Sequence, residues 1–167
     1  MIEFVLKDRR LRLYPDGTIT CRAVNRGKET KTGTWRMVKF SKKARGYLYC
    51  SITIDGFKRK FYQHRLLHLA HNPSWDIFDS SPNNYIDHIN HDTKDNSSEN
   101  LRIVTAQQNQ FNTNAKGYCW DKQTNKWRSY IILNDKQKCL GRFVNEEDAA
   151  AEYLKAKARL HVMPEVS

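Results

Sequence analysis

The stretch from Tyr85 to Asn109, which reads YIDHINHDTKDNSSENLRIVTAQQN, concentrates chemically versatile side chains rather than charge. Asp87 and His88 are adjacent, and Asn100 and Asn109 follow Asp87 by 13 and 22 positions. A carboxylate or an amide oxygen can bind a cation, and an imidazole can move a proton. One short stretch therefore offers groups for cation binding and for acid–base chemistry.

The elements that must position these groups begin with a hairpin. Two β-prone pieces, Tyr85–Ile89 and Leu101–Val104, flank a loop rich in Asn, Asp and Ser, whose short side chains bond their own backbone in turns. Successive side chains on a strand point to opposite faces. We therefore expect Asp87 and His88 to serve different tasks.

A short helix should follow the hairpin. Thr105 and Gln108 have the spacing of a capping box, in which each side chain satisfies the backbone N–H of the other. The helix should run from Ala106 to Asn112, with Asn109 on its second turn. The local unit is predicted to be strand, loop, strand, helix.

An adjacent Asp-His pair alone is better explained by an Asx-rich surface hairpin with a hydrogen-bonded histidine. Here the pair stands in register with N-L-R from Asn100, with V-T from Val104 and with Q-N from Gln108. This combination resembles the HNH nuclease family and its ββα-metal core. The resemblance also covers the segment from His64, whose H-R-L start is common before the D-H strand.

The resemblance implies a role for each residue of the set. Asp87 and Asn109 would be oxygen ligands of one divalent ion, His88 the general base that deprotonates water, and Asn100 the residue that braces the loop. Asn109 puts an amide where the third position of the motif can hold an imidazole, so the protein ligands are oxygens only. Such a site favours Mg²⁺ or Mn²⁺, with no zinc expected. The chain departs from its relatives at His91, where they usually have a glycine that can take positive φ without cost.

Charge and hydropathy favour small modules. The chain is 39% apolar with a net charge of +11, and its mean hydropathy is −0.80. Residues 1–63 carry 16 Lys/Arg against 5 Asp/Glu, residues 64–113 carry 3 against 6, and residues 114–167 carry 10 against 7. Two basic arms around an acidic centre are expected if the ends hold a polyanion and the middle holds a cation. We predict these three ranges as domains.

The sequence contains no apolar run long enough to span a bilayer, and its first residues lack the pattern of a signal peptide. We expect a soluble cytoplasmic protein, in the host cytoplasm if it is phage-encoded. Four cysteines, Cys21, Cys50, Cys119 and Cys139, stand singly without a C-x-x-C pair. They are predicted to be reduced, buried thiols and not a zinc site.

The first 63 residues predict two hairpins, with turns at residues 15–17 and 55–56. The polar stretches 26–35 and 40–46 are predicted to be loops. Lys58 and Lys60 fall on one face of the second hairpin. A basic hairpin of this kind suits the major groove of DNA, and a solubilising face explains it equally well.

A helix is predicted from His64 to a point before Pro73, because the residue before proline avoids the α region. His64, His68 and His71 fall near one face of it. Their spacing would suit a zinc trio, but no acidic or fourth ligand accompanies them, so we favour a structural role. Residues 72–84 are predicted to be a loop.

The C-terminal block predicts strands over 126–133 and 137–143, a turn at 134–135, and a helix beginning after Asn145. Its segments W-D-K, K-W-R-S-Y-I, L-G-R-F and E-D-A-A-A-E-Y resemble the AP2 DNA-binding domain over residues 116–161. That resemblance implies a sheet in the major groove, with these candidate contacts: Trp120, Lys122, Arg128, Tyr130 and Arg142. Trp127 could contact DNA or pack between sheet and helix.

The predicted fold class is α+β, with N-terminal antiparallel β hairpins, a central ββα-metal core and a C-terminal three-stranded sheet with a helix. The predicted function is a metal-dependent HNH endonuclease of the phage or homing type, a monomer that nicks double-stranded DNA and involves no membrane. The alternative is an AP2-like regulator with a non-catalytic HNH scaffold, against which the intact set of Asp87, His88 and Asn109 argues. A recombination or restriction nuclease would use the same site.

Overall fold

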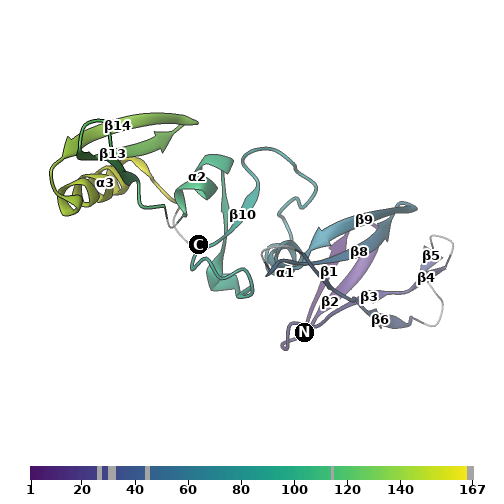
Figure 1. The fold of residues 1–167 in the computed structure, drawn as a ribbon. Helices are drawn as coiled ribbons and strands as arrows, with labels where there is room; N and C mark the ends of the chain where they lie inside the picture. The colour runs from purple at the N-terminus through teal and green to yellow at the C-terminus, as the bar shows by residue number, and fades with distance from the viewer. Residues whose placement is uncertain (26–27, 30–32, 44–45, 114, 165–167) are drawn as a thin grey trace. The chain divides into compact units, whose positions relative to one another are not determined.

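The computed structural model describes residues 1–25, 28–29, 33–43, 46–113 and 115–164. The chain divides into two compact units, one of Met1–Ser80 with His88–Arg102 and one of Ser81–Asp87 with Ile103–Ser167. Both are built from small antiparallel sheets and few helices (Figure 1). The chain is therefore a mixed α/β protein, as predicted at that level.

The first unit begins with a four-stranded sheet in the order β1-β2-β3-β6. Its strands are β1 Ile2–Leu6, β2 Arg9–Leu13, β3 Ile19–Arg22 and β6 Trp35–Met37. The predicted turn at residues 15–17 is confirmed, since Gly17 N–H donates to the Tyr14 carbonyl at 2.9 Å. Strand β1 is not among the predicted strands, and it pairs with β2 through a tight turn where Lys7 has φ of 59°.

A second sheet of this unit joins β7 Ser41–Lys42, β8 Leu48–Ile54 and β9 Phe57–Tyr62. The predicted turn between β8 and β9 is confirmed. The prediction of loops over 26–35 and 40–46 is wrong in part, because β5 Lys28–Glu29, β6 and β7 lie there, and β5 pairs with β4 Val24–Asn25. Backbone pairing compensated for the polar composition that predicted loops. Residues 26–27, 30–32 and 44–45 lie outside the described residues.

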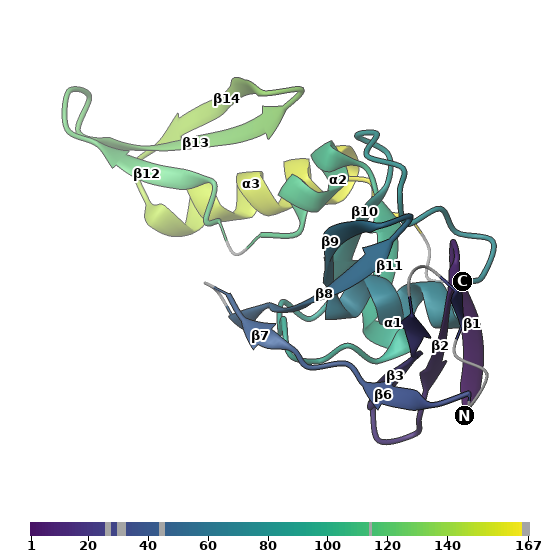
Figure 2. The ribbon, with the colours of Figure 1, turned by 90° about the vertical axis from the view of Figure 1, so that its right-hand side faces the viewer.

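Helix α1, Gln63–His71, confirms the predicted helix before Pro73 and contacts β1, β8 and β9 (Figure 2). The core between them is apolar, and its least exposed members are Leu6, Leu11, Ile19, Ile54 and Leu66. His64 and His68 are buried on α1, whereas His71 is exposed. Within the described part of the chain, no helix is long and apolar enough to cross a membrane.

The C-terminal sheet has the order β12-β13-β14. Its strands are β12 Tyr118–Asp121, β13 Lys126–Leu133 and β14 Lys136–Phe143, and α3, Glu146–Leu160, lies along one face (Figure 2). Ile131, Tyr153 and Ala156 form the buried centre of this block. The predicted strands, turn and helix are confirmed, and the AP2-like arrangement stays a prediction.

Two details of this region differ from expectation. Asn145 stands at the N-cap of α3, but its side chain accepts no hydrogen bond from the helix backbone, and its amide donates to the Asp148 carboxylate at 3.2 Å. All four cysteines are free, yet only Cys21 and Cys50 are buried, while Cys119 is half-buried and Cys139 exposed. The prediction of four buried thiols is wrong for the last two, because residues on a thin sheet with one covered face reach solvent.

Gly117 fixes how the C-terminal sheet meets its helix. It has φ of +70°, and a Cβ at this position would overlap the buried ring of Tyr153. Its carbonyl accepts from Tyr130 N–H at 2.8 Å. Glycine is therefore required both by the backbone conformation and by the ring packed on it.

We predict that Gly117→Ala lowers the free energy of unfolding by about 2–4 kcal/mol, because strain from the left-handed backbone adds to overpacking. Gly56→Ala is the control, since Gly56 has φ of +81° with nothing within 4 Å of its Cβ position. It should cost about 1 kcal/mol. Denaturant unfolding followed by tryptophan fluorescence measures both, and equal losses would contradict the role of the Tyr153 contact.

Candidate active site

Strands β10, Tyr85–His88, and β11, Leu101–Val104, form the predicted hairpin (Figure 2), and the 3₁₀ turn Ser98–Asn100 precedes β11. The boundary between the two compact units falls inside both strands. Asp87 and His88 are the last two residues of β10 and are only 6% and 5% exposed. Two consecutive polar residues are thus buried, and each requires a hydrogen-bond partner.

The loop from Asn90 to Asn100 is held by its own side chains. The Asn100 side-chain carbonyl accepts from Asn90 N–H at 2.9 Å, and its amide donates to the Asp95 carbonyl at 2.7 Å. Asp95 in turn accepts from the Asn90 amide at 2.8 Å and from the Ser97 hydroxyl at 2.7 Å. These hydrogen bonds lower the pKa of the Asp95 carboxyl, with the Ser97 hydroxyl the largest cause. The buried Asn100 makes the contacts that bracing the loop requires.

His91 adopts the left-handed conformation that a glycine would adopt freely, with φ of 64°. Its N–H donates to the His88 carbonyl at 3.0 Å. A non-glycine residue in this region costs on the order of 1 kcal/mol. The substitution of the usual glycine therefore leaves the turn in place at a small cost in stability.

His88 lies in a cluster of rings in the first unit. Its ring centroid is 5.2 Å from that of His64 in an edge-on arrangement and 5.9 Å from that of Tyr47. Burial, and then the charge of His88, lower the pKa of His64 to about 3, so His64 is neutral at neutral pH. On the other side, His88 Nε2 lies 3.0 Å from Asn96 Oδ1. The sequence did not single out Asn96, because nothing in the loop's composition distinguishes it from its polar neighbours.

Asp87 faces the helix of the second unit, α2, Ala106–Phe111. Both oxygens of Asp87 accept from the Asn112 amide at 3.0 Å. The predicted capping box of Thr105 and Gln108 is confirmed and fixes where α2 begins. Asn109 is half-buried one turn before Asn112, so the two lie near one side of the helix. Asn112 is a second residue that sequence reasoning missed, since it was taken only as the helix end.

The residues around Asp87 fit a divalent cation. Its carboxylate and the amide of Asn109 on the same helix side are hard oxygen donors. Among the described residues no group of three or more His, Cys, Asp or Glu could hold a metal ion. A cation at Asp87 would thus be held by oxygen from few protein groups and would keep several of its own waters, which Mg²⁺-like ions tolerate.

The candidate DNA contacts of the C-terminal sheet are divided between its faces. Arg128 pairs with Arg142 in register, and Trp120 pairs with Trp127. Neighbouring positions on a strand alternate, so the arginine pair and the tryptophan pair lie on opposite faces. Trp120 meets Trp127 edge-on at 5.5 Å.

The arginine face carries unused hydrogen-bonding capacity. Arg128 lies 5.7 Å from the Tyr130 ring, and its buried Nε has no partner among the described residues. Arg142 donates to the Asp121 carboxylate at 3.3 Å. Lys122 is exposed after β12, as are Lys58 and Lys60 on β9 of the other unit. Arg128, Tyr130 and Arg142 are therefore the members of the set that the sheet brings together.

We predict that Asn112→Ala lowers the free energy of unfolding by about 1.5–3 kcal/mol, because a hydrogen bond to a charged group is lost. In EDTA, Asn112→Asp should lower the free energy of unfolding further, since it places a second carboxylate against Asp87. Added Mg²⁺ should restore part of that free energy, because it binds only the folded form. Gln110→Ala on the exposed side of α2 is the control. Thermal unfolding with and without Mg²⁺ is the measurement. The cation site is contradicted if Mg²⁺ leaves Asn112→Asp unchanged.

Comparison with known proteins supplies an independent finding. Residues 61–111, which include α1, β10, β11 and α2, match a family model described as HNH endonuclease. No curated protein matches the chain. A solved structure described as "DNA binding and cleavage by the HNH homing endonuclease I-HmuI" is 18% identical, with a TM-score of 0.38, and the match covers 91% of this chain and 80% of that one. Over residues 61–111 the chain is therefore similar to HNH endonucleases.

Proposed function

We propose that the protein is a metal-dependent HNH endonuclease of the homing or phage type that nicks double-stranded DNA. The observation that carries this proposal is the pair Asp87 and His88. Both are buried at the end of β10, and each is held by an amide, Asn112 for the carboxylate and Asn96 for the imidazole. A buried acid and base held separately suit two different catalytic tasks.

His88 acts as the general base. It takes a proton from a water molecule, whose oxygen attacks the phosphorus in line, and the bond to the 3′ oxygen breaks. The products are a 5′-phosphate and a 3′-hydroxyl. Asn100 acts indirectly, because its hydrogen bonds to Asn90 and Asp95 set the loop that follows His88.

Asp87 and Asn109 hold one Mg²⁺ or Mn²⁺ through oxygen atoms. When bound, this ion supplies polarisation of the phosphate and stabilisation of the charge on the leaving oxygen. Asn112 orients the carboxylate by donating to both of its oxygens. One ion in one active site favours a single-strand nick. We propose that the protein acts as a monomer in the cytoplasm.

The flanking regions hold the DNA. The domains remain those assigned from charge: residues 1–63 and 114–167 bind DNA, and residues 64–113 cut it. In the C-terminal region the arginine face of an AP2-like sheet would enter the major groove, with Lys122 after β12 as a further contact. Trp120, on the opposite face, would contact DNA only outside that groove. Lys58 and Lys60 on β9 would contact phosphates. If cleavage is absent, the rival is a DNA-binding regulator that keeps the HNH unit as a scaffold.

His88→Ala should retain folding and DNA binding and lose cleavage by about 10²–10⁴-fold, because a general base is removed. His71→Ala is the matched control, since His71 is an exposed histidine on α1. A plasmid-nicking assay with Mg²⁺ or EDTA, beside a binding assay, measures both. Cleavage by His88→Ala at the wild-type rate would reject the assignment.

Base-reading residues should differ from residues that only neutralise charge. Arg128→Ala or Arg142→Ala should cost about 1–3 kcal/mol on the preferred sequence and relax its preference, if either pairs with a guanine edge. Lys122→Ala should weaken all sequences alike and reduce the salt slope by about one ion. Binding over a salt series on specific and scrambled duplexes distinguishes them. A chain truncated after Thr113 that binds as well as the full chain would exclude the C-terminal block as the DNA anchor.

A further inference from the structure

Arg9 places a charge on the apolar face of a strand. Side chains alternate along β2, and its buried members are Arg9, Leu11 and Leu13. The arginine is only 8% exposed. A guanidinium stays charged in a protein, and burying a charge without an ion pair is unfavourable. The position of Arg9 therefore requires an explanation other than packing.

The hydrogen bonds of Arg9 use only part of its guanidinium. Its Nη2 donates to the Arg22 carbonyl at 2.8 Å and to Cys21 Sγ at 3.2 Å. A guanidinium has five N–H donors, and those on Nε and Nη1 have no partner among the described residues. No carboxylate in the described part of the chain forms an ion pair with Arg9. The buried charge thus lacks a counter-charge from these residues.

Arg9 lines a pocket of about 520 Å³, here called the Arg9 pocket, to which both sheets of the first unit contribute. Four further cations line it: Arg22 on β3, Arg36 on β6, Lys39 after β6 and Lys58 on β9. None of the described lining residues is Asp or Glu. Like charges gathered in one concave site raise the local positive potential, so the pocket favours an anion.

The two thiols of the Arg9 pocket do not supply the missing charge. Cys21 Sγ donates to the Arg22 carbonyl at 3.7 Å, and as a donor it keeps its proton. Burial, and then the Cys21 sulfur, raises the pKa of the Cys50 thiol to about 12. Cys50 is therefore neutral at neutral pH. The counter-charge of Arg9 has to come from a ligand.

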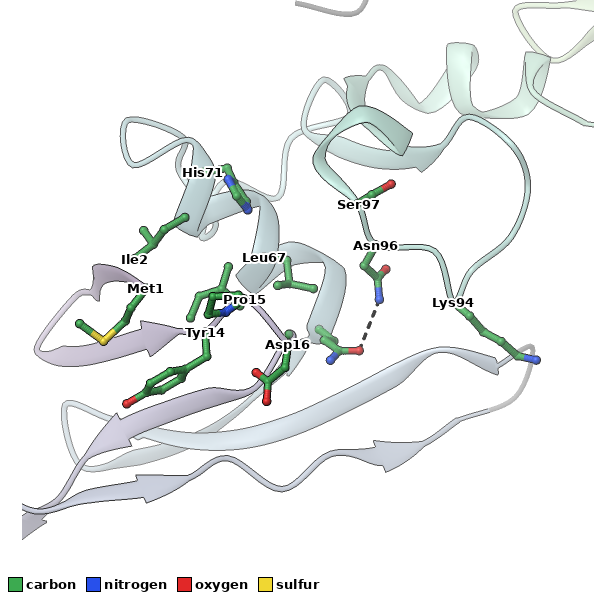
Figure 3. A pocket seen from close by; sticks show the side chains of 13 residues that line it. Met1, Ile2, Tyr14, Pro15, Asp16, Leu67, His71, Lys94, Asn96 and Ser97 are labelled. Atoms are coloured by element: carbon green, nitrogen blue, oxygen red, sulfur yellow. Dashed lines mark hydrogen bonds between the residues drawn. The ribbon is translucent and has the colours of Figure 1, made fainter.

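Charge distinguishes the Arg9 pocket from another pocket of the first unit. That pocket, of about 540 Å³, is similar in size, but Asp16 lines it together with Lys94 (Figure 3). Ile2 and Leu67 add an apolar wall there. A carboxylate offsets the lysine, so such a pocket does not favour anions. Of these two pockets, only the Arg9 pocket has the charge of an anion site.

We propose that the Arg9 pocket binds a phosphate of the DNA backbone, an assignment that rests on the proposed function. A phosphodiester supplies the missing counter-charge, and its oxygens accept charge-assisted hydrogen bonds from the unused donors of the guanidinium. The exposed side chains of Arg36, Lys39 and Lys58 then contact neighbouring phosphates of the same strand. The pocket fixes one point of the duplex on the N-terminal unit and reads no base.

The first test is the stability of the full chain without DNA. Replacing a buried charge by an apolar side chain of similar length is often neutral or stabilising. In phosphate-free buffer with EDTA, Arg9→Met should therefore have a Tm at or above that of the wild type. A Tm below that of the wild type, or failure of Arg9→Met to fold, would show that Arg9 supports the fold and would overturn the proposal.

The second test is DNA binding, measured by fluorescence anisotropy in EDTA on a labelled duplex of about 20 base pairs. Arg9→Met should weaken binding by about 10–100-fold and reduce the salt slope by about one ion, because one phosphate loses its charged partner. Arg12→Met is the matched control, since Arg12 lies on the other face of β2 and pairs with Glu3 at 3.0 Å. Its affinity should change less than about threefold. Equal losses would show that only net charge matters and would overturn the proposal.

Inorganic phosphate distinguishes a DNA phosphate from a free one. The duplex should raise the Tm of the wild type more than that of Arg9→Met, because it binds only the folded form. Phosphate alone should raise the wild-type Tm only weakly, since one small anion cannot contact the exposed cations as well. A rise with phosphate as large as that with the duplex, and absent in Arg9→Met, would assign the pocket to free phosphate and overturn the proposal.

The proposed function and the phosphate site fail separately. An active nuclease whose Arg9→Met variant binds DNA as tightly as the wild type rejects the phosphate site alone. A wild type that binds DNA through Arg9 in EDTA but nicks nothing with Mg²⁺ rejects the nuclease function and keeps the site. Binding in EDTA and cleavage in Mg²⁺ are read independently, so each result decides one of the two.

Discussion

The alternation of side chains along a β-strand is the constraint on which the candidate site depends. Asp87 and His88 are consecutive, so they point to opposite sides of β10, and both are buried. Each then needs its own hydrogen-bond partner, because a buried polar group without one costs about 1–3 kcal/mol. Asn112 meets this need for the carboxylate and Asn96 for the imidazole. One strand thereby keeps an acid and a base apart although they are neighbours in sequence.

The loop after His88 is ordered by amides and carboxylates instead of an apolar core. Asn100 and Asp95 close it from within, and Asn96 ties it to α1 through Gln63. Such short polar side chains bond backbone groups without long rotamer chains to immobilise, so they order a tight loop at low entropic cost. The same network tolerates His91 at positive φ, since the surrounding bonds fix the turn whichever residue occupies it.

The two compact units differ in what holds them. The first packs a helix on sheets around a leucine- and isoleucine-rich core, and burial lowers the pKa of His64 and His68 on that helix, so both are neutral. The second relies on a small cluster around Ile131 and Tyr153, with Gly117 allowing the ring to approach the backbone. A sheet with only one covered face leaves the other free for side chains such as Arg128 and Arg142. Small cores of this kind suit modules whose work is done at their surfaces.

The sequence by itself determined the local elements that carry strong signals. The capping box at Thr105, the turn residues at 15–17 and 55–56, and the start of α3 after Asn145 depend on neighbours in the chain, and all appear as predicted. The spacing of Asp87, His88, Asn100 and Asn109 indicated the HNH endonuclease family, whose model matches residues 61–111. These features depend on neighbouring residues or on the number of positions between two residues. They can therefore be recognised in the sequence without knowledge of long-range packing.

Only the tertiary structure decided which amides meet Asp87 and His88. Asn96 and Asn112 stand among many similar residues, and the choice between them depends on where the loop closes and where α2 ends. It also decided that β5, β6 and β7 are strands, because cross-strand pairing overrides polar composition. The division of Arg128 and Trp120 between two faces likewise follows from strand register, which is a property of pairs of strands and not of either sequence alone.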